Sequence, residues 1–256
     1  MSRRILWWLA PIFGVVGFLT LWEVLVVVFD VRPFIIPRPT KIVASIGDDP
    51  SFYWRHARAT IWEAAVGFLI AFVVGLATAA VLAHVRFVER AVSPLLIILQ
   101  VTPIIAYAPA IVLWVGFGFK PIVVITAIAC YVPFVINATI GFRSVDPTLI
   151  ELARSVDASK IEVFRRLRLP SALPSVFSAA RIAVGLALIG AVLGEWFGGS
   201  KVGLGNAVKT AQGQGLTLQL WSSIFVLALI GGIAIILIGV VERLVLHWHS
   251  SQRDLE

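Results

Sequence analysis

Long apolar runs alternate with short polar segments along this chain. A helix needs about 20 mostly apolar residues to cross a hydrocarbon core of roughly 30 Å. These runs are continuous, whereas the strands of a membrane β-barrel alternate apolar and polar residues over about ten positions. We therefore expect an all-α, polytopic helical membrane protein with about six transmembrane helices, at residues 6–29, 61–84, 91–114, 122–142, 175–197 and 218–245. Pro and Gly interrupt or flank the third and fifth of these runs.

The distribution of basic residues predicts the orientation of the spans. Six spans place both termini on one side of the membrane. If that side is the cytoplasm, the inner segments hold thirteen of the 21 Lys and Arg residues, as the positive-inside rule requires. We expect both termini to be cytoplasmic, with residues 146–174 inside and 30–60 outside. No repeat or flexible linker divides the chain, so residues 1–256 are expected to form a single transmembrane domain with its core at 60–245.

Composition supports the membrane class. The chain is 59% hydrophobic and only 14% charged, whereas soluble domains carry about 25% charged residues. A net charge of +7 would suggest a nucleic-acid partner in a soluble chain, but in a membrane chain Lys and Arg report topology, so we expect the lipid bilayer and no nucleic acid as a partner. Cys130 is alone, which excludes an intrachain disulfide. The four His residues lie at different proposed span ends, and no metal site is predicted among His56, His84, His247 and His249.

Small residues recur at every fourth position in two of the spans. They are Gly67, Ala71, Gly75, Ala79 and Ala83 in the second span, and Gly190, Gly194 and Gly198 in the fifth. Such a stripe allows close helix contact, either inside one bundle or at a dimer seam. Six helices enclose little volume, so a transport path would need a second copy or another partner.

A charged segment at residues 146–174 lies between the fourth and fifth spans. Asp146 can cap a helix that starts with Pro147, and Ser159 with Glu162 fits the capping box of a second helix. Pro170 and Pro174 are expected to end this second helix. The segment is either a shaped docking surface or an amphipathic loop held on the inner leaflet by its arginines.

Within this segment, Glu151-Leu152-Ala153 is followed by a spacer and by Leu169-Pro170. This pattern resembles the cytoplasmic EAA loop of binding-protein-dependent ABC transporter permeases. The resemblance implies that the loop is a coupling helix, which docks on a separate ATPase subunit through Glu151, Leu152, Ala153, Asp157, Ala158, Ser159, Leu169 and Pro170. The family usually has Gly where this chain has Asp157, and Asp adopts the left-handed conformation less well than Gly but better than most residues.

Further stretches extend the resemblance over nearly the whole chain. They are HARATIWEAAVGF, LQVTPIIAYAPAIVLWVGFGFKP, VPFVINATIGFRSVDP and GAVLGEWFGGSKVGLG, which are similar to blocks of the nitrate/sulfonate/taurine branch. Many anion-handling members carry Arg where this chain has Glu63, so the wording is closer to permeases for thiamine pyrimidine precursors, riboflavin and hydantoins. The resemblance implies a type I importer fold in a bacterial inner membrane. It also implies two ATPase subunits that bind ATP and Mg, a second permease copy and an extracytoplasmic solute-binding protein.

No catalytic constellation or phosphate-cradling loop is found in the sequence, so we expect neither an enzyme nor a bound cofactor. Polar groups inside spans usually face a bundle interior or a cavity. The candidates for a translocation path are Gln100, Thr102, Pro103, Tyr107, Asn137 and Glu195. Gln100 and Asn137 could instead form interhelical hydrogen bonds, and Glu195 could be a solvated carboxylate near the outer interface. The rival functions are a secondary transporter or channel, which would need no ATPase, and a membrane enzyme.

Overall fold

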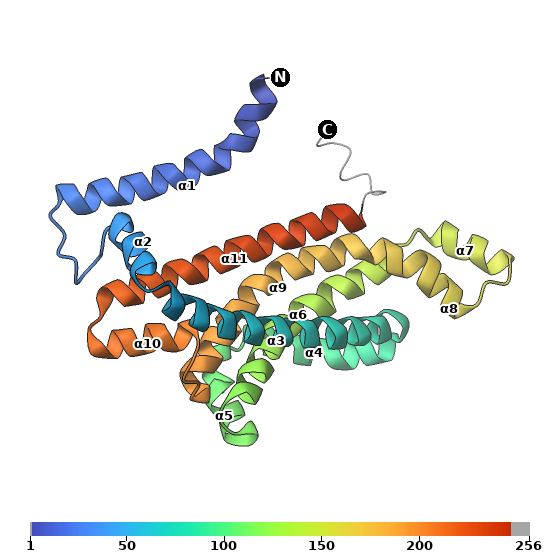
Figure 1. Ribbon diagram of the computed structural model, residues 1–256. Helices are drawn as coiled ribbons and strands as arrows, with labels where there is room; N and C mark the ends of the chain where they lie inside the picture. Colours follow the sequence, from blue (N-terminus) through green and yellow to red (C-terminus); the bar gives the residue numbers. More distant parts are fainter. Residues whose placement is uncertain (1, 247–256) are drawn as a thin grey trace.

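A computed structural model describes residues 2–246. His247 and His249, for which no metal site was predicted, lie outside the described residues. All the regular secondary structure in the described part is helical (Figure 1). Its elements are α1 (Ser2–Val28), α2 (Pro39–Asp48), α3 (Pro50–His84), α4 (Arg86–Val101), α5 (Ile104–Val115), α6 (Phe119–Arg143), α7 (Pro147–Ser155), α8 (Lys160–Val163), the π-helix η1 (Phe164–Arg168), α9 (Leu169–Gly198), α10 (Leu204–Gln214) and α11 (Thr217–Val245). Five helical segments within the described residues are long and apolar enough to cross a membrane, or six if one bent pair counts as a span. The all-α fold class is confirmed.

The centre of the bundle is α6, which packs between α3 and α9 (Figure 1). Glycines on both neighbours make the approach close. A Cβ on Gly75 would lie 2.7 Å from Phe134 Cβ, and one on Gly190 would lie 2.7 Å from Thr126 Cα. Real Cβ contacts are longer than this, so only glycine fits at these positions. The small-residue stripes therefore pack inside one chain, and the dimer-seam alternative is wrong for them.

The third predicted span, 91–114, is not one helix. The chain breaks between α4 and α5, whose axes are bent by 103°. Thr102 and Pro103 form the break, with Thr102 extended at φ −70° and ψ 120°. A residue before proline is pushed out of the helical region by the proline ring, which explains why α4 ends at Val101.

The second helix of the charged segment does not end at Pro170 or Pro174, so that prediction is wrong. From Lys160 to Gly198 the chain forms one long helical segment, which begins well before the predicted span at 175–197. The Leu169 N–H donates to the Phe164 carbonyl in a wider π-turn. Pro170 lacks an N–H, and a π-bulge is a common way for a helix to absorb such an interruption.

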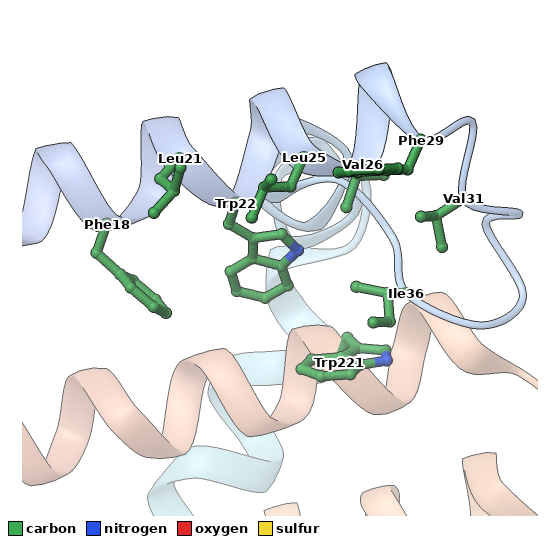
Figure 2. A pocket seen from close by; sticks show the side chains of 9 residues that line it. All are labelled: Phe18, Leu21, Trp22, Leu25, Val26, Phe29, Val31, Ile36 and Trp221. Atoms are coloured by element: carbon green, nitrogen blue, oxygen red, sulfur yellow. The ribbon is translucent and has the colours of Figure 1, made fainter.

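The outer helices leave much of their apolar surface uncovered. α1 lies apart from the central bundle and approaches α11 near one end (Figure 1). There the rings of Trp22 and Trp221 are 5.4 Å apart. They line an apolar cavity of about 480 Å³ between α1, the segment that follows it and α11 (Figure 2). Thr40 donates its backbone N–H and its hydroxyl to the Glu23 carboxylate, at 3.1 and 2.8 Å, which joins α2 to α1.

Candidate functional site

The segment predicted to dock a partner forms a helical hairpin that projects from one end of the bundle (Figure 1). Asp146 caps α7 by accepting a hydrogen bond from the Thr148 N–H at 2.8 Å, and the hydrogen bonds from Thr148 lower the pKa of this carboxyl. Ser159 and Glu162 form the predicted capping box, in which the Glu162 N–H donates to Ser159 Oγ at 3.2 Å and the Ser159 N–H donates to Glu162 Oε2 at 2.9 Å. Between the two helices, Asp157 adopts a left-handed conformation with φ 54°.

The hairpin carries large apolar side chains in exposed positions. Leu152 is 62% exposed, and Val156 and Ile161 are each 70% exposed. α7 has no fully buried residue. These side chains lie beside the turn, where the sequence places a polar cytoplasmic segment rather than a span. The tip of the hairpin therefore presents three large apolar side chains that nothing in the described residues covers.

The residues predicted to dock on a partner differ in how exposed they are. Leu152 and Glu151 are exposed, and Glu151 lines a cavity behind α7. Ala153 and Ala158 are half-buried and close the turn through the Ala158 N–H, which donates to the Ala153 carbonyl at 3.0 Å. Leu169 packs against the bundle beside Ala79, Phe142 and Val176. The sequence did not single out Val156 or Ile161 as contact residues, although their apolar character in a charged segment was a usable signal.

The predicted path residues lie in four separate places. Gln100, Thr102 and Pro103 lie at or next to the break between α4 and α5, and the Thr102 hydroxyl donates to the Ile98 carbonyl at 2.8 Å. Tyr107 is half-buried in α5 and packs with the cluster that joins α5 to α6. Asn137 Nδ2 donates to the Pro133 carbonyl of its own helix at 2.9 Å, not to a neighbouring helix.

Glu195 lies at the other end of the bundle, in a closed junction of α3, α9 and α10. It is only 1% exposed, so the solvated-carboxylate alternative is wrong. The Thr60 hydroxyl donates to Glu195 Oε1 at 2.6 Å, and the Asn206 N–H donates to Oε2 at 2.9 Å. Thr60 Oγ1 in turn accepts from the Leu204 N–H at 2.8 Å. Gly203 is required here, because at φ 146° a Cβ would lie 2.2 Å from the Glu195 carboxyl.

Two further ionisable groups complete this junction. Glu63 is buried, and its Oε2 has no hydrogen-bond partner within the described residues. His56 is buried as well, and its Nδ1 lies 2.8 Å from the Gly203 carbonyl oxygen and 3.0 Å from the Gly203 nitrogen. Sequence reasoning did not connect these residues, since Thr60 and Glu195 are 135 positions apart. Among residues 2–246, no group of three or more His, Cys, Asp or Glu side chains could hold a metal ion.

Comparison with known proteins assigns the chain to a family. Residues 67–251 match the family described as binding-protein-dependent transport system inner membrane component. This chain belongs to that family. It is thus the membrane-embedded permease component of an ABC transport system for a small solute, and the ATPase of such a system is a separate subunit. The predicted membership of the ABC transporter permeases is confirmed, as is the prediction that the chain is a transport subunit rather than an enzyme.

Two relatives are similar over most of their length. The chain is 33% identical to the formylaminopyrimidine transport permease protein of Halalkalibacterium halodurans, covering 91% of this chain and 93% of the relative. It is 34% identical to the riboflavin transport system permease protein of Chloroflexus aurantiacus, covering 91% and 87%. The fold is similar to a solved inward-facing methionine ABC transporter, with a TM-score of 0.67 at 21% identity, over 76% of this chain and 96% of that one.

Proposed function

We propose that this chain is the permease of an ATP-driven importer for a small heterocyclic solute in a bacterial inner membrane. Support for the solute class comes from the two relatives above, which are described as transporting a formylaminopyrimidine and riboflavin. The nitrate-, sulfonate- and taurine-like anions remain the second solute class. In this proposal two copies of the chain form the path, an extracytoplasmic binding protein delivers the solute, and two ATPase subunits bind ATP and Mg.

The observation that carries the coupling step is the exposed apolar surface of the α7–α8 hairpin. Leu152, Val156 and Ile161 project into what would be the cytoplasm, where uncovered side chains of this size are unfavourable. Burying one large aliphatic side chain contributes about 1.5–3 kcal/mol. An ATPase groove that covers these three residues would therefore gain binding energy from them and would hold the hairpin by its tip. Closure of the ATPase pair would then be transmitted through α7 to the bundle.

The α4–α5 break supports a path at Gln100, Thr102, Pro103 and Tyr107. α4 has 16 residues and α5 has 12, which at 1.5 Å per residue makes them about 24 and 18 Å long. Neither crosses a hydrocarbon core of roughly 30 Å alone. A non-helical backbone at membrane depth is tolerated only where it is covered by protein or lines a watery cavity. Asn137 and the enclosed Glu195 are weaker path candidates, since both already have hydrogen-bond partners.

The experiment compares two sets of substitutions in the hairpin. Leu152→Asp puts a charge into the proposed contact, whereas Arg165→Gln with Arg166→Gln removes charge from exposed positions of η1. Burial of an unpaired charge costs several kcal/mol, so we expect Leu152→Asp to abolish ATP-dependent uptake and co-purification of the ATPase while membrane insertion is unchanged. The arginine pair should transport normally. Loss of uptake in the arginine pair alone would indicate a leaflet-bound loop, and uptake without any ATPase would indicate the secondary-transporter alternative.

A further inference from the structure

A polar cavity of about 500 Å³ lies behind the hairpin, between α7 and the bundle. Its walls come from the C-terminal ends of α3 and α6, the start of α4, α7 and η1. Phe142, Val145 and Ile150 give it an apolar side, and arginines give it a charged one. The cavity lies where α3 and α6 end, and because both helices are long and apolar enough to span a membrane, we expect it near the depth of the lipid head groups. It is separate from the exposed tip proposed to contact the ATPase.

The arginines that line this cavity differ in how far their charge is balanced. Arg143 is fully engaged: its guanidinium donates to both oxygens of Glu89, with Nη2 at 2.7 Å from Oε2, and also to the Leu82 carbonyl. Arg154 has no ion-pair partner among the described residues. The carboxylate of Glu151 lines the same cavity, but no ion pair joins it to Arg154 in the described structure. The lining therefore carries an excess of positive charge, since Arg86, Arg154 and Arg168 accompany Arg143 and only one carboxylate, Glu151, lies among them.

Arg168 presents a second unbalanced charge, and its neighbour His84 does not compensate it. The His84 imidazole makes two polar contacts. Its Nε2 lies 3.2 Å from Arg168 Nη1, and its Nδ1 lies 2.7 Å from the Ala80 carbonyl oxygen. Arginine only donates and a carbonyl only accepts, so these two contacts fit a His84 ring that donates from Nδ1 and accepts at Nε2. The Arg168 Nε–H is buried and has no hydrogen-bond partner within the described residues. Protein encloses this Nε, so an anion in the cavity would meet the Arg168 guanidinium through its terminal nitrogens.

We propose that this cavity binds a phosphate group, held between Arg154 of α7 and Arg168 of η1. Arginine recognises phosphate through paired N–H donors, and basic pockets at the cytoplasmic ends of membrane helices bind anionic lipid head groups. The phosphate could belong to an anionic phospholipid of the inner leaflet or be a free phosphate. Since α7 buries none of its own residues, the bound anion would tie it to the bundle. The proposal does not depend on the solute or on ATPase docking.

The test uses the purified full-length chain with any subunits that remain bound, in detergent at constant ionic strength. Its thermal unfolding midpoint is followed during titration with phosphatidylglycerol, with phosphatidylcholine, and with inorganic phosphate. We expect phosphatidylglycerol to raise the midpoint of the unmodified protein and phosphatidylcholine to leave it unchanged. If inorganic phosphate alone raises it and competes with the lipid, the free ion is the source.

Two variants and a charge-matched control decide whether the cavity is responsible. At about 1 kcal/mol per basic residue near an anionic surface, Arg154→Gln should weaken the apparent affinity about fivefold, and Arg154→Gln with Arg168→Gln about 30-fold. The control is Arg165→Gln with Arg166→Gln, which removes the same charge from η1 positions that do not line the cavity. Arg154→Gln removes no described contact, so its folding should be unaffected. Equal losses in the double variant and the control, or no response to either phosphate source, would overturn the proposal.

Discussion

The tight contact between α9 and α6 gives a prediction whose size follows from the structure. Gly190 and Gly185 lie in the same helix, five positions apart. A Cβ on Gly190 would lie 2.7 Å from Thr126 Cα, which is backbone and cannot rotate away, whereas a Cβ on Gly185 would meet nothing within 4 Å. Alanine favours the helix by about 1 kcal/mol over glycine at either site. Overpacking adds a cost of about 1–3 kcal/mol at Gly190 only.

Gly185→Ala should therefore raise the thermal unfolding midpoint in detergent. Gly190→Ala should be less stable than Gly185→Ala by about 1–3 kcal/mol, and its midpoint should be lower. For a chain of this size each kcal/mol corresponds to about 2–4 °C. The measurement is the midpoint of both variants and of the unmodified protein by intrinsic fluorescence, with a monodisperse elution profile as the control for folding. Equal midpoints for the two variants would show that α9 does not touch the α6 backbone at Gly190, and the central packing described above would be wrong.

Three further predictions concern topology, the outer junction and the hairpin turn. Single cysteines at Asp48 and Ser159, in a cysteine-free background, should label from opposite sides with a membrane-impermeant thiol reagent; labelling of both in intact cells would refute the topology. Thr60→Val leaves a buried Glu195 oxygen without its donor, a loss of about 1–3 kcal/mol, and should speed proteolysis of the α9–α10 loop; an unchanged cleavage rate would contradict this contact. Asp157→Gly should preserve uptake, whereas Asp157→Ile should impair it, because φ 54° is strained for a β-branched residue; equal uptake would argue against the turn.

Local signals in the sequence predicted the parts of the fold that depend on neighbouring residues. The apolar runs located the spans, and the Asp146 and Ser159 caps gave the correct starts of both hairpin helices. The family resemblance implied a position usually held by glycine at Asp157, and the structure gives that residue a left-handed backbone. The glycine stripes predicted close helix contact, although only the structure shows that both stripes face α6.

Features that depend on distant residues could not be predicted in the same way. α3 begins at Pro50, earlier than the apolar run at 61–84, because Tyr53, His56 and Thr60 are buried in its polar first turns. The Glu195 junction joins groups far apart along the chain, and nothing local distinguishes its buried carboxylate from a solvated one. Pro170 looked like a helix end, yet a single π-turn was enough to continue the helix through it.

The glycine-lined contacts around α6 also have a mechanical consequence. Helices whose backbones touch cannot slide or rotate past one another without a clash, because a packed interface has discrete rather than continuous arrangements. We expect α3, α6 and α9 to move as one stiff lever during a transport cycle, with bending concentrated at Thr102–Pro103 and in the 144–146 turn before α7. Spin-label distances between α3 and α6 should then be the same in nucleotide-free and ATP-bound complexes, while distances from α6 to α5 change. Changes of similar size in both distances would mean that the lever is not rigid.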